Sequence, residues 1–84
     1  MSDSGHEERA HHLEEKQARL RRRMAEVAAA VAATEEQIAG TFEEMAGQRP
    51  SPDAERLRAE AEQARDGAAK ERDRARELRR PQRR

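Results

Sequence analysis

Three histidines near the N-terminus, His6, His11 and His12, are the residues best suited to metal chemistry. His11 and His12 each follow a glutamate at i,i+4 spacing, which places two potential ligands on one face of a helix. A zinc site needs three or four ligands in tetrahedral reach, and the chain has no cysteine to complete one. The sequence therefore predicts solvent-exposed histidines, with no metal and no other cofactor.

The three serines are the candidates for a catalytic nucleophile, but their positions indicate structural roles. Ser2 and Ser4 lie at the N-terminus, and Ser51 lies at a predicted helix cap. No Gly-rich strand-to-helix turn surrounds any of them. Carboxylates are plentiful, yet general acid–base catalysis needs an enclosed pocket, and a two-helix rod offers no obvious one. We therefore expect no catalytic residues and no enzymatic activity.

Two arginine clusters are the remaining candidates for binding chemistry, one inside the first predicted helix and one at the C-terminal end. In a hairpin they would come to the same end, as a footprint for nucleic acid or an acidic partner. Zero net charge and the lack of stacking aromatic residues favour the alternative, a solvated charge run. The candidate anion-binding residues are Arg21, Arg22, Arg23, Arg79, Arg80, Arg83 and Arg84.

Composition indicates which elements must position these residues. Of the 84 residues, 43% are charged, 33% are hydrophobic, 17 are alanine, and only Phe42 is aromatic. This pattern is typical of long helices and coiled coils. High charge and low hydrophobicity also fit a disordered chain, which is the alternative interpretation. A seven-residue repeat of apolar residues favours the helical one.

The repeat is strongest in the first half of the chain, where large apolar residues form two columns that share one stripe of a helix. It continues upstream through two leucines and predicts a helix over about residues 5–46, with Ser4 and Glu7 at capping-box spacing. The predicted seam and interaction residues of this helix are Leu13, Leu20, Met24, Val27, Val31, Ile38, Phe42 and Met45.

Turn-forming residues then divide the chain. Gly47 can take the left-handed conformation that ends a helix, and the turn should cover residues 47–51. Ser51 is a good N-cap, and Pro52 suits the first position of a second helix over about residues 52–80. Pro81 ends that helix. Residues 1–4 and 81–84 should form a flexible N-terminus and a disordered basic C-terminal tail.

The second helix carries a regular seam built mainly from alanine, which lets two helix backbones approach closely. The predicted fold is all-α: one unit over residues 1–84, with two long antiparallel helices in a helical hairpin. Folding the second helix back places Leu57 opposite Phe42, Ala75 near Met24 and Arg65 opposite Glu35. The predicted seam of the second helix is Ala54, Leu57, Ala61, Ala64, Ala68, Glu71, Ala75 and Leu78.

The seam of the first helix outruns its partner, because the overlap should end near residue 20. One alanine-rich seam is also a thin core for a small chain. Both facts predict self-association, as a homodimer or four-helix bundle, or binding to another helical protein. The leading functional hypothesis is a non-enzymatic coiled-coil interaction or oligomerisation module. The alternatives are a nucleic-acid-associated protein that uses the arginine-rich end and a largely disordered chain that folds on a partner.

The N-terminal residues are polar and acidic and do not resemble a signal peptide. The longest run of low polarity is far shorter than the roughly 20 apolar residues that span a bilayer. We therefore expect a cytoplasmic protein that does not associate with membranes.

Overall fold

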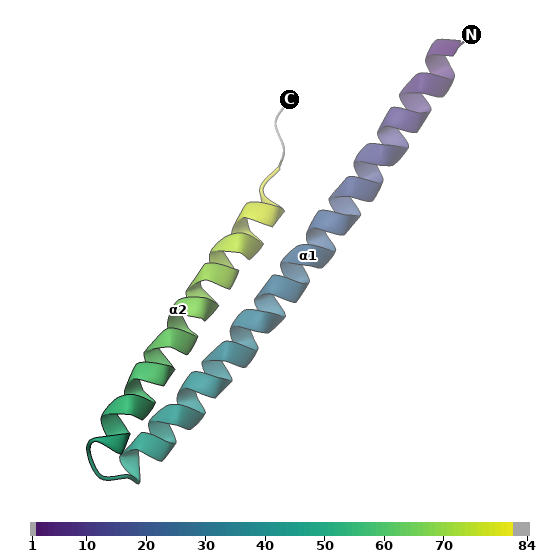
Figure 1. Ribbon diagram of the computed structural model, residues 1–84. Helices are drawn as coiled ribbons and strands as arrows, with labels where there is room; N and C mark the ends of the chain where they lie inside the picture. The colour runs from purple at the N-terminus through teal and green to yellow at the C-terminus, as the bar shows by residue number, and fades with distance from the viewer. Residues whose placement is uncertain (1, 82–84) are drawn as a thin grey trace.

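Two antiparallel helices make up almost all of the structure, a computed structural model that describes residues 2–81 and their side chains from Gly5 onward (Figure 1). Helix α1 covers Ser2–Gly47 and helix α2 covers Asp53–Arg79. Together they form a rod of 76 × 17 × 12 Å. The predicted all-α helical hairpin is confirmed. The predicted disordered tail falls largely on residues 82–84, which lie outside the described residues.

The ends of α1 differ from the prediction. The helix begins at Ser2, so Ser4 lies inside it and is not an N-cap. No glycine of the described chain has a positive φ, so Gly47 does not end α1 through a left-handed conformation. Instead, Gln48 N–H donates to the Met45 carbonyl (3.1 Å) and Arg49 N–H donates to the Ala46 carbonyl (3.3 Å). These i→i+3 bonds tighten the last turn and satisfy carbonyls that the helix leaves free.

Helix α2 begins one residue later than predicted. Pro52 is its N-cap residue, no side chain caps the helix, and Ser51 lies outside it. Asp53 and Glu55 in the first turn place negative charge at the positive end of the helix dipole. At the other end Arg80 is extended, with a ψ of 135°. The proline that follows disfavours the helical conformation at this position, so α2 ends where Pro81 predicts.

Alanines of both helices form the core between them. Four of the five in α1 recur every seven residues, with Ala28 between the first two, and those of α2 follow the predicted seam. Each is at most 4% exposed, so the small side chains of one helix pack against those of the other. The buried alanines are Ala25, Ala28, Ala32, Ala39 and Ala46 of α1 and Ala54, Ala61, Ala68 and Ala75 of α2.

The large apolar residues of α1 do not lie in this seam, and the prediction was wrong by one position. Each member of the predicted main column directly precedes a buried alanine. One residue along a helix is a rotation of about 100°, so the large side chains lie on the flank of the hairpin. Alanine facing alanine lets the backbones approach closely, whereas large side chains would hold them apart. The displaced residues are Met24, Val27, Val31, Ile38 and Met45.

Phe42 and the two leucines of α2 are the large residues that do contribute to the core. Phe42 packs on a cluster of Ala46, Ala54 and Leu57, as the predicted pairing of Phe42 with Leu57 requires. At the open end, Leu78 packs against a cluster of Ala25, Ala28 and Ala75. Ala75 therefore meets alanines of α1 instead of Met24.

Candidate interaction surface

Seven large apolar side chains of α1 remain exposed, and their spacing of three, four or seven residues places them on one stripe of the helix. Their exposed fractions range from 36% at Met45 to 61% at Val27. Large apolar patches are uncommon on the surface of a monomeric protein and mark contact sites. We call this surface the α1 stripe; its residues are Leu13, Leu20, Met24, Val27, Val31, Ile38 and Met45.

Helix α2 borders the α1 stripe and gives it depth. A hollow of about 410 Å³ lies between Leu20, Met24 and Val27 on one side and Glu71 and Arg74 on the other. The predicted seam position of Glu71 is thus at the edge of this hollow, and its side chain is half-buried.

A second hollow of about 300 Å³ lies nearer the turn, beside Ile38 and Phe42. Thr34 and Thr41 also line it. The Thr41 hydroxyl donates to the Gln37 carbonyl (3.1 Å), so its polar group is satisfied within α1. The Thr41 position of the repeat is therefore compatible with an apolar neighbour.

The other flank of the hairpin carries ion pairs between the helices. Arg72 binds Glu36 through two hydrogen bonds, one of them 2.8 Å long. Arg65 pairs with Glu43. The sequence had suggested Glu35 as its partner, and that prediction was wrong. Glu36 and Glu43 follow seam alanines by four positions, on the side opposite to the α1 stripe. Charges therefore hold one flank of the hairpin, while the other flank is apolar and open.

The Glu36–Arg72 pair is the only part of this network that shifts a pKa clearly. The hydrogen bonds from Arg72 lower the pKa of Glu36 below its ordinary value of 4.5, although partial burial opposes this. The same hydrogen bonds raise the pKa of Arg72. The pair is therefore charged throughout the neutral range.

Among the described residues, Glu35 is the one whose side chain has a buried polar atom without a hydrogen-bond partner. Its carboxyl group lies against Gly67, where a Cβ atom would overlap Oε2 and lie 3.0 Å from Cδ. Oε2 is buried and accepts no hydrogen bond. Gly67 thus leaves the space that this carboxylate occupies, on the border between the two helices.

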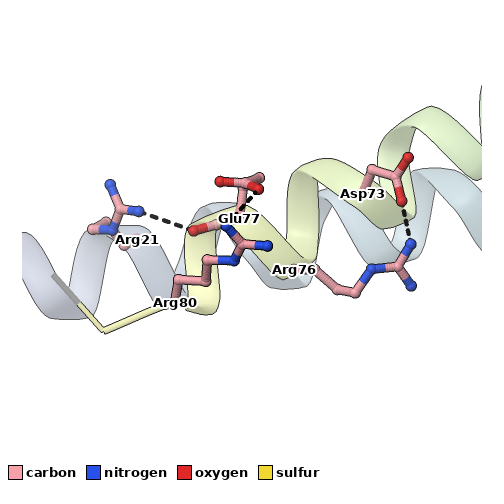
Figure 2. Close-up of polar contacts among 5 residues, drawn as sticks. All are labelled: Arg21, Asp73, Arg76, Glu77 and Arg80. Atoms are coloured by element: carbon pink, nitrogen blue, oxygen red, sulfur yellow. Dashed lines mark hydrogen bonds and ion pairs between the residues drawn. The ribbon is translucent and has the colours of Figure 1, made fainter.

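One arginine of each predicted cluster, Arg21 and Arg80, lies beside Glu77 at the open end of the hairpin (Figure 2). Arg21 Nη2 donates to the Glu77 carbonyl (3.1 Å), and Arg80 Nη1 lies 3.2 Å from Glu77 Oε1. Arg76 pairs with Asp73 on the same helix. Acidic groups therefore offset part of the positive charge here. Of the other predicted anion-binding residues, Arg22, Arg23 and Arg79 are exposed, and Arg83 and Arg84 lie outside the described residues.

The histidines do not gather ligands. His11 Nε2 lies 2.9 Å from Glu15 Oε1 on the next turn of α1. Within the described part of the chain, no three histidine, aspartate or glutamate side chains are grouped as a metal site would require. Likewise, neither described helix has the length and apolar character needed to cross a membrane.

No protein-family model matches the chain, and comparisons with curated proteins and with solved structures find no match.

Proposed function

We propose that this chain is a protein–protein interaction and oligomerisation module without catalytic chemistry, and that the α1 stripe is its contact surface. The observation that carries the proposal is the exposure of seven large apolar side chains while alanines fill the core. Burying such side chains against a partner is favourable by about 25 cal/mol per Å² of apolar area. A module of this kind also has no need of the enclosed, charged pocket that an enzyme requires.

Sedimentation equilibrium of the intact chain tests the proposal, with one acidic substitution in the α1 stripe and one outside it. Val31 is 38% exposed in the centre of the stripe. Ala33 is also exposed and lies on the same helix but outside the stripe. We expect the wild type and A33E to exceed the monomer mass of 9.6 kDa and V31E to sediment as a monomer.

A wild-type chain that stays monomeric at high micromolar concentration would contradict this proposal. So would equal association of V31E and A33E, because the contact surface would then lie elsewhere. Circular dichroism at each concentration shows in parallel whether helicity depends on association, as the alternative of folding on a partner requires.

Nucleic-acid binding through the arginine-rich end is a second candidate, and the meeting of Arg21 and Arg80 at Glu77 supports it. Binding of this kind depends steeply on salt. A chain that ends after Leu78 should then lose affinity for DNA or RNA at low salt, while V31E should keep it. Absence of binding by the intact chain at low salt would remove this candidate.

A further inference from the structure

We infer that the partner of the α1 stripe is the same stripe of a second copy, packed antiparallel across a two-fold axis near Ala29. The inference rests on the proposed function, and it adds the identity, direction and register of the partner. It starts from a second seam on α1, which lies beside the alanines that pack against α2. One column of this second seam is Gln17, Met24, Val31, Ile38 and Met45; the other is Leu13, Leu20, Val27, Thr34 and Thr41.

In an antiparallel pair of helices, each column of one helix packs against the other column of its partner. The column that contains Val31 therefore faces the partner's column that contains Val27. With Val31 opposite the partner's Val27, Ile38 meets the partner's Leu20 and Met45 meets the partner's Leu13. Symmetry repeats each of these layers. Six of the seven residues of the α1 stripe therefore face another large apolar side chain.

The remaining layers contain the polar residues of the repeat. Gln17 faces the partner's Thr41, and Met24 faces the partner's Thr34. Gln17 and Thr41 thus meet each other between the Leu20–Ile38 and Leu13–Met45 layers, and Thr34 opposes Met24 beside the central layers. Polar seam residues commonly fix the register of a helix pair.

Charges beside the stripe are complementary in this register. Lys16 and Glu44 are exposed and form no ion pair within the described chain. On the outer flank Lys16 lies opposite the partner's Glu44. On the inner flank Arg21 lies opposite the partner's Glu35, the carboxylate that has no hydrogen-bond partner on its buried oxygen. The Arg21 guanidinium bonds the Glu77 carbonyl through Nη2 and has further donors.

The neighbouring registers fit less well. A shift of one heptad in one direction places Glu35 opposite the partner's Glu14, so that like charges meet. A shift in the other direction leaves Leu13 beyond the partner helix and sets Val31 against the partner's Thr34. The first shift still sets six residues of the α1 stripe against large apolar partners, so only its like charges exclude it. The layers exclude the second shift.

Disulfide formation from a single introduced cysteine tests this register, since the chain has no cysteine of its own. Ala30 is exposed beside the proposed axis and faces the partner's Ala30. Ala33 is another exposed alanine on the same helix, outside the stripe. Under mild oxidation we expect A30C to form a covalent dimer at least about tenfold faster than A33C, because only Cβ atoms roughly 4 Å apart can be bridged without movement.

A charge exchange provides an independent test by sedimentation. K16E sets two glutamates against two glutamates across the interface, and E44K sets lysine against lysine. Each should raise the dimer dissociation constant about tenfold, and K16E/E44K should restore it to within about threefold of the wild type.

The outcomes separate this inference from the proposed function. If V31E abolishes association but A30C does not cross-link and K16E/E44K does not restore affinity, the register is wrong and the interaction surface stands. If the wild type is monomeric, both fail. Cross-linking of A30C together with rescue by the exchanged charges supports the antiparallel dimer.

Discussion

Glu35 and Gly67 form the most unusual contact of the hairpin at the scale of single residues. The carboxylate occupies space that any other residue at position 67 would fill, and its buried oxygen has no hydrogen-bond partner. A buried acceptor without a partner lowers stability, so this contact does not add to the free energy of unfolding of the hairpin. In the proposed dimer the same group acquires Arg21 of the partner.

Replacing Gly67 by alanine should therefore stabilise the chain. The displaced atoms are the far end of a flexible side chain, which can swing into water, and a helical glycine costs about 1 kcal/mol relative to alanine. We expect G67A to raise the melting temperature by an amount similar to that of G40A, since a Cβ at Gly40 meets nothing within 4 Å. A lower melting temperature for G67A, with a higher one for G40A, would mean that the Glu35–Gly67 contact is favourable.

The Glu36–Arg72 pair predicts how stability changes with pH. Because folding lowers the pKa of Glu36, this group stabilises the folded chain above its ordinary value of 4.5, and the contribution disappears as pH falls through the lowered pKa. The melting temperature of E36Q should thus be lower than that of the wild type at pH 7, and the two melting temperatures should converge in acid. E62Q, which removes an exposed glutamate outside the ion pairs of the described chain, serves as the control. A difference between E36Q and wild type that is unchanged in acid would refute this role.

At the scale of elements, the hairpin depends on two alanine faces that approach closely. Ala68 is 1% exposed in the seam of α2, and its neighbour Ala69 is exposed. A68L should lower the free energy of unfolding by about 1–3 kcal/mol, because extra methylene groups force a packed seam apart. A69L adds the same atoms outside the seam and should change it little. Urea unfolding of both variants checks the prediction, and equal stabilities would place the core elsewhere.

The sequence predicted some of these elements well because local chemistry determines them. Gly47, Pro50 and Pro52 mark the turn, and the alanine seam of α2 has no competing apolar column. In α1, by contrast, an alanine column and a column of large residues repeat side by side every seven residues. Hydrophobicity favours the large column as the seam, whereas close packing against α2 favours the alanines. That choice depends on the partner helix, so periodicity alone did not identify it.

The same limit applies to the candidate surface. The sequence singled out the residues of the α1 stripe, but it assigned most of them to the inside of the hairpin and only the end near Leu13 to a partner. The structure extends the unpartnered surface to Met45, along nearly the whole overlap. The pairs of Arg65 with Glu43 and Arg72 with Glu36 follow from the corrected rotation of α1.

At the scale of the whole molecule, the proposed dimer doubles the mass and lengthens the rod by only about 14 Å, because each α1 extends roughly nine residues past the other. The two-fold axis near Ala29 lies close to the middle of α1, so two copies overlap along most of Ser2–Gly47. Added to the 76 Å of the single hairpin, this offset makes the pair about 90 Å long, whereas association end to end would give roughly 150 Å.

Small-angle X-ray scattering of the intact chain tests the central claim most directly, because forward scattering gives the mass and the distance distribution gives the length. We expect twice the chain mass of 9.6 kDa, with a maximum dimension only about 14 Å longer than the 76 Å of the single hairpin. A mass of one chain, with the length of the single hairpin, at high micromolar concentration would show that the α1 stripe remains exposed, and would contradict the account.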